Sequence, residues 1–366
     1  MPSTTTNNDC QRPSTACGNG GLMSAIDNVG GWPAVLGRLA NGNDLSADEC
    51  RAVLGSMLSG EASDAQIAAF IVGLRIKGET VDEMIGMQAA MMDVVVPVVV
   101  PAGTIDIVGA GGAPSRRSHA LNVSTMASFV AAGAGATICK HGNLKASSTS
   151  GSFDLLTELG INFDLSPDEL SARIRDIGIG FVFARAHHPS MRHVGPVRAE
   201  LGIPTVFNIL GPLSNPGRVR RQVIGTADWS IARRMAEVLQ ATGSIRALVV
   251  HGEGSLDELT TTGTSKVVSV DGDSITEYEI DAEDLGLARV TDVDLAGGDA
   301  ATNAAIAAEL FAGADIPARG IVAFNAAAGL VVAGLADDFE AGIGMAFASI
   351  DEGRAKTKLD QLVAAG

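Results

Sequence analysis

The segment from residue 104 to residue 125 combines a β-branched run, a glycine-rich turn and the start of a helix. Thr104-Ile-Asp-Ile-Val108 is followed by Gly109-Ala-Gly-Gly112, and Asn122-Val-Ser-Thr125 then opens an apolar stretch. Glycines let backbone N–H groups approach phosphate oxygens closely, and a helix N-terminus adds its positive dipole end. The pattern indicates a site for a phosphorylated ligand. For this stretch alone, an ordinary strand-to-helix turn capped by Ser124 is an equal alternative.

A second polar cluster follows the run Thr137-Ile-Cys-Lys140, which predicts a buried strand. Lys140-His-Gly-Asn143 lies at its end, and hydroxyl side chains then lead into another helix at Ser147, Ser148, Ser150 and Ser152. The carboxyl ends of strands are where open α/β sheets bind ligands, and polar groups are costly to bury without partners. We interpret the cluster as part of a binding site. The alternative is a solvated loop whose serines cap the next helix.

Two adjacent carboxylates, Asp257 and Glu258, follow the β-branched run from Arg246 to His251. Such a pair suits Mg²⁺, because this ion usually keeps several waters and also contacts the phosphates of its ligands. Asp257 would also cap a helix beginning at Glu258, and the spacing alone favours the cap. The residues by themselves leave both interpretations open.

Arg198 is expected on a helix that precedes a strand beginning at Thr205. A planar guanidinium suits a carboxylate ligand, and an ordinary surface charge is the alternative. Three nearby histidines have no cysteine or carboxylate at ligand spacing and are not interpreted as metal ligands: His187, His188 and His193.

The chain after Pro101 alternates short β-branched runs with alanine-rich helical stretches, which predicts crossover units around a parallel or mostly parallel sheet. The expected strands are Thr104 to Val108, Thr137 to Lys140, Gly180 to Ala184, Thr205 to Leu210, Val223 to Thr226, and Arg246 to His251. The expected covering helices are Val123 to Ala132, Phe153 to Leu159, Pro167 to Ile177, and Ser230 to Leu239. Alternating runs from Lys266 to Ile280 predict a hairpin with a type I′ turn around Asp271 and Gly272.

The chain before Pro101 predicts a small helical domain. Ser/Thr-x-x-Glu/Gln pairs mark three helix starts between Trp32 and Met92: Ser46 with Glu49, Ser63 with Gln66, and Thr80 with Glu83. We expect a disordered tail over residues 1–25, a helical domain over residues 26–98, and an α/β domain over residues 99–366. Later helices near residues 190–200 are candidates to join the helical domain.

Composition limits the class of protein. The formal net charge of −16 opposes nucleic-acid binding over most of the surface, so any phosphate binding requires a local pocket. No apolar run approaches the roughly 20 residues of a membrane span. The four cysteines form no C-x-x-C pair, which favours a reducing compartment, and the start lacks the features of a secretory signal. We expect a cytoplasmic small-molecule enzyme without membrane association.

Several motifs together, in one order, resemble the anthranilate phosphoribosyltransferase family. They are Gly60-Glu-Ala-Ser-Asp-Ala-Gln66, Val108-Gly-Ala-Gly-Gly112, Asn122-Val-Ser-Thr125, Lys140-His-Gly-Asn143, Phe207-Asn-Ile-Leu-Gly-Pro-Leu213 with Asn215-Pro216, and Val250-His-Gly252 with Leu256-Asp-Glu258. The resemblance extends from about Trp32 onward. It implies a helical domain beside an α/β phosphoribosyl-binding and catalytic domain of the nucleoside phosphorylase/phosphoribosyltransferase type. It also implies an active site between them and a homodimer through the helical domains.

The resemblance implies transfer of the phosphoribosyl group from phosphoribosyl pyrophosphate to the amine of anthranilate, in tryptophan biosynthesis, with Mg²⁺ as cofactor. The implied catalytic residues are Lys140 and His141. The implied contacts to phosphoribosyl pyrophosphate are Gly109, Gly112, Asn122, Ser124, Thr125, Lys140, Asn143, Ser147, Ser148 and Ser152. Those to anthranilate are Gly109, Asn143 and Arg198, and those to the metal are Ser124, Asp257 and Glu258.

Some positions depart from the family pattern. Ala113 replaces an aspartate, the stretch from Pro114 to Leu121 is longer by three residues, and three further positions differ: Ala120, Leu144 and Arg185. Arg116 and Arg117 are candidates to restore phosphate contacts, and we expect their loop to be mobile without ligand. Two alternatives to the family reaction are a paralogue with another aromatic acceptor and a non-catalytic relative that binds a ligand or nucleic acid.

Overall fold

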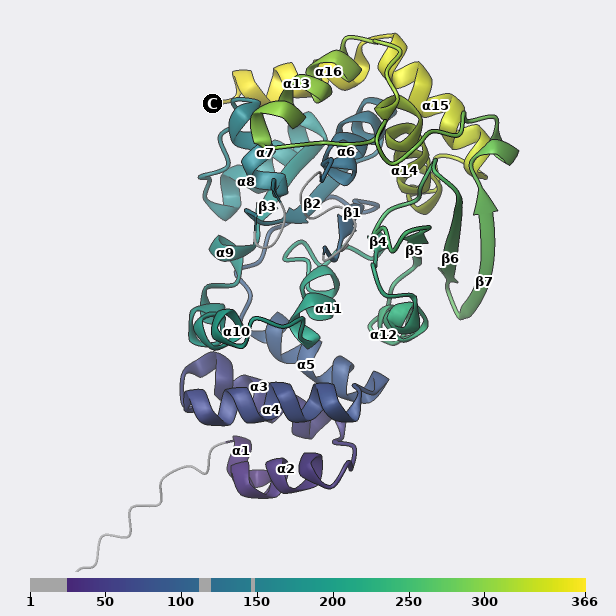
Figure 1. Cartoon of the computed structure of the whole chain (residues 1–366). Coiled ribbons are helices and arrows are strands. Elements are labelled where there is room, and N and C mark those ends of the chain that lie inside the picture. Colours follow the sequence, from purple (N-terminus) through teal and green to yellow (C-terminus); the bar gives the residue numbers. More distant parts are fainter. Residues whose placement is uncertain (1–24, 112–119, 146–148) are drawn as a thin grey trace, which may run out of the picture.

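The computed structural model describes residues 25–111, 120–145 and 149–366. Of the predicted N-terminal tail, only Ala25 lies within these ranges, and it begins the first helix. Five helices form the bundle at the bottom of Figure 1: α1 (Ala25–Asn28), α2 (Gly31–Ala40), α3 (Ala47–Ser59), α4 (Asp64–Lys77) and α5 (Val81–Asp93). None of the described helices is long and apolar enough to cross a membrane.

The three predicted helix starts in this bundle are confirmed. Ser46, Ser63 and Thr80 each accept the backbone N–H of the third helical residue, and the acid or amide at that residue accepts the cap's own N–H. These reciprocal bonds satisfy donors that a helix N-terminus otherwise leaves unpaired.

The sheet is mostly parallel, as predicted. Its strands are β1 (Asp106–Gly109), β2 (Ile138–Gly142), β3 (Ile179–Phe183), β4 (Arg221–Gly225), β5 (Arg246–Gly252), β6 (Thr264–Asp271) and β7 (Ser274–Asp281). Strands β1, β4 and β5 run parallel, and β6 and β7 follow in antiparallel order. The parallel pair β2 and β3 continues the sheet beyond β1, because Ile105 bridges to Ile138.

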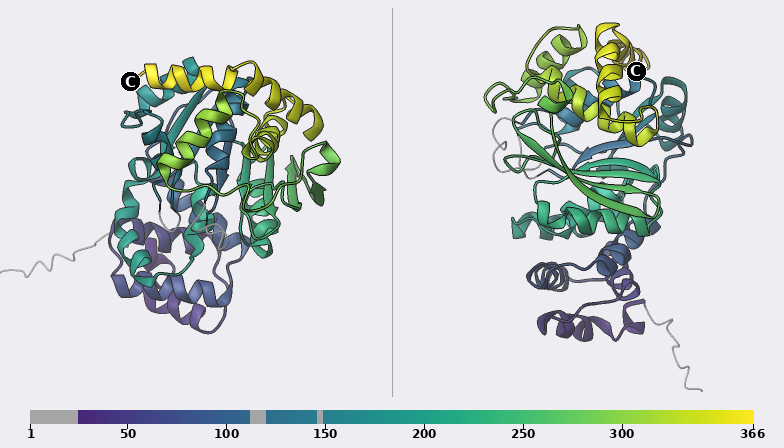
Figure 2. Two further views of the ribbon diagram at one scale, coloured as in Figure 1. Left: turned by 45° about the horizontal axis from the view of Figure 1, so that its top comes forward. Right: turned by 90° about the vertical axis from the view of Figure 1, so that its right-hand side faces the viewer.

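Helices cover both faces of this sheet (Figure 2). One side carries α6 (Val123–Gly133), α14 (Ala318–Ala333), α15 (Phe339–Asp351) and α16 (Arg354–Ala364), while α12 (Ala232–Ala241) lies on the other, toward the bundle. Helices α7 (Ser152–Glu158), α8 (Pro167–Ile177) and α13 (Ala300–Phe311) complete the domain, with short 3-10 turns at Trp229–Ile231 and Glu283–Leu285. The four predicted covering helices are all present, with small shifts at their ends.

The connection between bundle and sheet corrects one prediction. The run from Thr205 to Leu210 is not a strand, because it belongs to helix α11 (Val206–Leu213). Its apolar residues are buried on several sides, so they show no alternation, and a short apolar run does not distinguish a buried strand from a buried helix. Ahead of it lie α9 (Ala184–His187), a 3-10 turn (Pro189–His193) and α10 (Gly195–Leu201), which carries Arg198 as predicted.

The predicted hairpin is confirmed, but its turn lies one residue later. Asp271 pairs with Ser274, which leaves Gly272 and Asp273 as the two loop residues. Gly272 has a φ of 56° and Asp273 has no positive φ, so the turn is not of type I′, which needs positive φ at both positions.

Candidate active site

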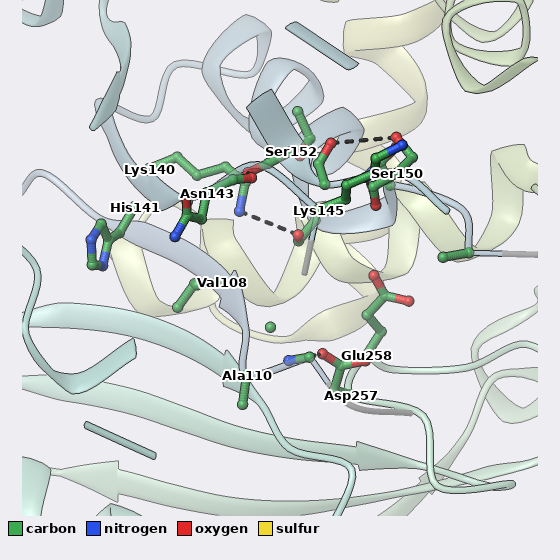
Figure 3. A pocket seen from close by; sticks show the side chains of 18 of the residues that line it. Val108, Ala110, Lys140, His141, Asn143, Lys145, Ser150, Ser152, Asp257 and Glu258 are labelled. Carbon is green, nitrogen blue, oxygen red and sulfur yellow. Dashed lines mark hydrogen bonds between the residues drawn. The ribbon is translucent and has the colours of Figure 1, made fainter. Parts of the chain in front are cut away.

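The carboxyl ends of β1 and β2, the start of α6 and the segment after β5 enclose a cavity of about 290 Å³. Its walls include Lys140, Ser124, Thr125, Asp257 and Glu258, which the sequence analysis had placed on separate elements. Figure 3 shows Lys140 and Asn143 on one side of this cavity and the two carboxylates on the other. We call it the donor cavity.

Lys140 is the buried cation of the donor cavity. Its side chain is 2% exposed, and Nζ donates to the Ile107 carbonyl (2.6 Å) and to Ser124 Oγ (3.2 Å). Burial lowers the pKa of Lys140, while the charges of Asp106, Glu258 and Asp257 oppose that change. The surrounding carboxylates therefore favour the charged form of Lys140. Its interaction with an anionic ligand would be strong, because the site is buried and its dielectric constant is low.

Asp257 and Glu258 lie opposite, and no helix begins at Glu258, so the helix-cap interpretation is wrong. Asp257 Oδ2 accepts the Gly111 N–H at 2.7 Å. A Cβ at Gly109 would lie 2.5 Å from the same oxygen. Glycine at position 109 thus lets the carboxylate lie directly against the end of β1.

These oxygens fit a magnesium ion that shares its coordination with a ligand. Two half-buried carboxylates and the Ser124 hydroxyl line the same cavity. Among the described residues, no three His, Cys, Asp or Glu side chains converge as a complete metal site. Mg²⁺ commonly takes only one or two carboxylates and completes its shell with waters and phosphate oxygens, which is the donor set available here.

The α6 start supplies hydroxyl and amide groups to the donor cavity. Thr125 Oγ1 is buried without a hydrogen-bond partner among the described residues, although Thr125 lines the cavity. Asn122 also lines it, and so do Asn143 and Ser152, whose Oγ donates to the Asn143 carbonyl (3.2 Å). Three residues expected to bind phosphoribosyl pyrophosphate lie outside the described ranges: Gly112, Ser147 and Ser148. The same holds for Ala113, Arg116 and Arg117 of the loop that we expect to be mobile.

A second cavity, of about 280 Å³, adjoins the first toward α10 and α11. The two share walls that include Gly109, His141 and Asn143. The second cavity adds Arg198, Phe207 and several apolar side chains. We call it the acceptor cavity, because it opens onto the donor cavity at the shared residues.

Arg198 is the half-buried cation of the acceptor cavity. Its guanidinium lies 4.9 Å from the centre of the Phe207 ring, and Nε has no hydrogen-bond partner among the described residues. Burial lowers the pKa of Arg198. A half-buried guanidinium with an unpaired N–H favours a role in binding a carboxylate ligand over the interpretation of Arg198 as an ordinary surface charge.

His141 lies at the wall between the cavities. Burial, followed by the charges of His188 and Lys140, lowers the pKa of its imidazole to about 3. The ring is therefore neutral near pH 7, and Nε2 has no hydrogen-bond partner within the described part of the chain. A neutral ring in this place suits orientation of a ligand better than cationic stabilisation.

Sequence reasoning missed Asp106, which is fully buried on β1 and bonded to the backbone of the neighbouring strand β2. Its carboxylate accepts the His141 N–H (3.1 Å) and the Asn215 amide (2.8 Å). Asn215 also donates to the Cys139 carbonyl at 2.9 Å. The available signal was an acidic residue inside a β-branched run, because a carboxylate is costly to bury without partners. The pattern of the run predicts only a strand and gives Asp106 no role of its own.

Three of the residues that depart from the family pattern also line the site, and Ala120 is one of them, in the donor cavity. Leu144 is half-buried in the wall of the donor cavity, and Arg185 is exposed at the acceptor cavity. Arg185 has no hydrogen bond or ion pair among the described residues.

The fold, a helical bundle beside a mostly parallel α/β sheet, is that of a glycosyl transferase family. Residues 33–95 match the family described as "Glycosyl transferase family, helical bundle domain", and residues 102–356 match "Glycosyl transferase family, a/b domain". The chain belongs to the anthranilate phosphoribosyltransferase family.

Three relatives show how far the similarity extends. The anthranilate phosphoribosyltransferase of Parvibaculum lavamentivorans is 48% identical over 91% of this chain and 97% of its own. The crystal structure of the Thermus thermophilus enzyme is 39% identical, with a TM-score of 0.85 over 90% of this chain and 98% of its own. The Saccharomyces cerevisiae enzyme in complex with PRPP (phosphoribosyl pyrophosphate) and Mg is 25% identical, with a TM-score of 0.82 over 94% and 99%.

Proposed function

We propose that this protein transfers the phosphoribosyl group of phosphoribosyl pyrophosphate to the amine of anthranilate and releases pyrophosphate, as a step of tryptophan biosynthesis. The observation that carries the proposal is the junction of two cavities, one with a buried and one with a half-buried cation. Lys140 lies in the donor cavity, Arg198 lies in the acceptor cavity, and Gly109, His141 and Asn143 form the shared wall. Family membership favours this reaction over another acceptor or a non-catalytic role.

In the proposed reaction the C1–O bond to pyrophosphate breaks while the amine nitrogen forms a bond to C1 and loses a proton. The aromatic amine is already neutral near pH 7, so the protein need not remove a proton before attack. The positive charge of Lys140 stabilises the leaving pyrophosphate. Arg198 holds the acceptor carboxylate, and His141 and Asn143 orient the amine.

The remaining expected contacts to the donor are part of the same proposal. They are two glycines, one amide and five hydroxyl residues of the segments 109–125 and 147–152: Gly109, Gly112, Asn122, Ser124, Thr125, Ser147, Ser148 and Ser152. Ser124, Asp257 and Glu258 would hold Mg²⁺ in the donor cavity. When bound, the ion would neutralise charge that develops on the leaving pyrophosphate.

We also propose the expected organisation of the molecule. Residues 26–98 form the helical domain together with the helices near residues 190–200, residues 99–366 form the catalytic domain, and two copies associate through the helical domains in the cytoplasm. Contacts of α10 with α4, and of the 3-10 turn at Pro189–His193 with α3, support the joined helical unit.

Formation of phosphoribosyl anthranilate tests the function. Purified protein with both substrates and Mg²⁺ should consume anthranilate, which is followed by loss of its fluorescence, and should release one pyrophosphate for each anthranilate. Pyrophosphate release with other aromatic amines but not with anthranilate would indicate a different acceptor. Absence of both turnover and donor binding would contradict the proposal.

A further inference from the structure

Asn303, on the first turn of α13, is a fully buried amide close to the donor cavity but not part of its wall. Its Nδ2 donates to the Ala120 carbonyl and to Asn122 Oδ1, each at 2.8 Å. Its Oδ1 accepts the Gly298 N–H at 3.0 Å. One side chain from late in the chain therefore contacts both the end of the glycine loop and the residue that precedes α6.

The orientation of the Asn303 amide is fixed by its surroundings. The Gly298 N–H requires an acceptor, so the oxygen of Asn303 faces Gly298 and the NH₂ group faces the two oxygens opposite. The backbone is close enough that a Cβ at Gly297 would lie 2.4 Å from the Ala120 oxygen and 2.6 Å from Asn303 Oδ1. The segment before α13 is thus closely fitted to this contact.

This contact in turn fixes the amide of Asn122. Asn122 Oδ1 accepts from Asn303 Nδ2 and from Ser150 Oγ (2.9 Å), so both of its lone pairs are used. Among residues 25–111, 120–145 and 149–366, Asn122 Nδ2 makes one long bond, to the Ser150 carbonyl at 3.4 Å, and its second proton has no partner there, so it is available to a ligand. Asn122 lines the donor cavity, where an N–H donor suits an anion and a carbonyl oxygen would oppose it.

We propose that Asn303 is a positioning residue for the phosphoribosyl donor, because it holds Asn122 with its NH₂ group available to the donor cavity. The inference rests on the proposed function, which supplies the donor. Asn303 also anchors Ala120, where the chain returns from the glycine loop to α6.

The substitution Asn303→Asp tests this role, because it keeps the shape and the acceptor for Gly298 but removes both N–H donors. We expect the KM for phosphoribosyl pyrophosphate to rise about ten-fold or more, as for loss of a charge-assisted hydrogen bond, while the KM for anthranilate changes less than about two-fold. Asn303→Ser is the second variant, with donor binding measured by calorimetry, should the aspartate reduce the yield of folded protein.

A double-mutant cycle with Asn122→Asp asks whether Asn303 acts through Asn122. If it does, the double variant should have a KM for the donor within about two-fold of that of Asn122→Asp alone. Multiplicative effects of the two substitutions would overturn the proposed route through Asn122.

Ser349→Ala is the matched control, because Ser349 is also fully buried and donates to α6, at the Val130 carbonyl (2.8 Å), far along the helix from Asn122. It should lower the melting temperature without changing the KM for the donor. Equal losses for both substrates in Asn303→Asp, or no change for either, would overturn the positioning role. A wild-type protein without turnover or donor binding would instead contradict the proposed function itself.

Discussion

At the scale of single residues, the two cavities differ in the charges that surround their cations. Lys140 faces carboxylates on the far wall, whereas Arg198 has no carboxylate partner within the described residues. The donor cavity thus suits a polyanion that brings a metal ion, and the acceptor cavity suits a single carboxylate attached to an apolar ring.

Replacing Arg198 by alanine should raise the KM for anthranilate far more than that for phosphoribosyl pyrophosphate. Loss of a charge-assisted contact costs roughly 1.5 to 3 kcal/mol, which corresponds to about ten- to hundred-fold in affinity. Steady-state kinetics with each substrate varied in turn measures both constants. Arg192→Ala is the control, since Arg192 is exposed on the neighbouring 3-10 turn. Equal losses for both substrates would contradict a role in binding the carboxylate.

Neutralising the acidic pair, by Asp257→Asn combined with Glu258→Gln, should weaken Mg²⁺-dependent binding of phosphoribosyl pyrophosphate and leave the fold intact. The pair lies on a half-buried loop and contributes little to the core. Calorimetric titrations with and without Mg²⁺ measure the dependence. Glu277→Gln with Glu279→Gln, on the exposed edge of β7, makes the same change of charge as a control. An unaltered metal dependence would rule out these ligands.

Asp106 should give the stability a characteristic pH dependence. Burial raises the pKa of the Asp106 carboxyl to about 6, although Lys140 and hydrogen bonds lower it in part. Between about pH 4 and 6 the folded protein keeps a proton on Asp106 that the unfolded chain has lost. This proton's contribution to the free energy of unfolding is present at pH 4 and declines by roughly 3 kcal/mol as the pH rises through 6. In urea unfolding, the free energy of unfolding of the wild type should fall relative to that of Asp106→Asn as the pH rises over this range. Parallel curves would contradict it.

At the scale of elements, the capped helices of the bundle depend on Glu83 more than on any exposed cap residue. Glu83 is fully buried and accepts the Thr80 N–H (2.8 Å), the Leu45 N–H (2.9 Å) and Lys77 Nζ (2.9 Å). A single carboxylate thus joins the start of α5 to the loop between α2 and α3 and to the end of α4.

Glu83→Gln should therefore lower the free energy of unfolding by roughly 3 kcal/mol, because it leaves the Lys77 charge, whose side chain is 5% exposed, with one carboxylate partner fewer. Denaturant unfolding measures this. The corresponding change at an exposed cap, Glu169→Gln at the start of α8, should lower the free energy of unfolding far less, because that carboxylate is solvated. Similar costs at the two sites would mean that the buried ion pair adds little.

The elements predicted from sequence were those with local signals. Cap residues and the alternating runs of the hairpin are set by neighbours a few positions away, so they could be found without the fold. The run from Thr205 to Leu210 was assigned wrongly because burial from several sides removes its periodicity. Motif residues such as Lys140 were placed at the site by resemblance. Asn303 could not be found, because its partners lie about 180 positions away in the sequence.

At the scale of the whole molecule, the helical bundle and the sheet share a hydrophobic core. One continuous cluster of buried side chains includes Leu54 and Phe70 of the bundle, Met235 of α12 and Val249 of β5. A second cluster lies on the opposite face of the sheet, between it and α6, α14 and α15. The bundle therefore does not have a core separate from that of the sheet. Residues of α10 and α11 line the acceptor cavity, and these two helices lie between the bundle and the sheet in Figure 1.

The shared wall of the two cavities also bears on hydrolysis. A donor bound alone would present its C1 carbon to an acceptor cavity that is large enough for several waters, and water competes with the amine as a nucleophile. The apolar side of that cavity, with Phe207 and Pro212, offers such waters few hydrogen bonds and holds them poorly. In the proposed reaction, we expect the surface that would accept the aromatic ring also to limit hydrolysis of the donor before the acceptor binds.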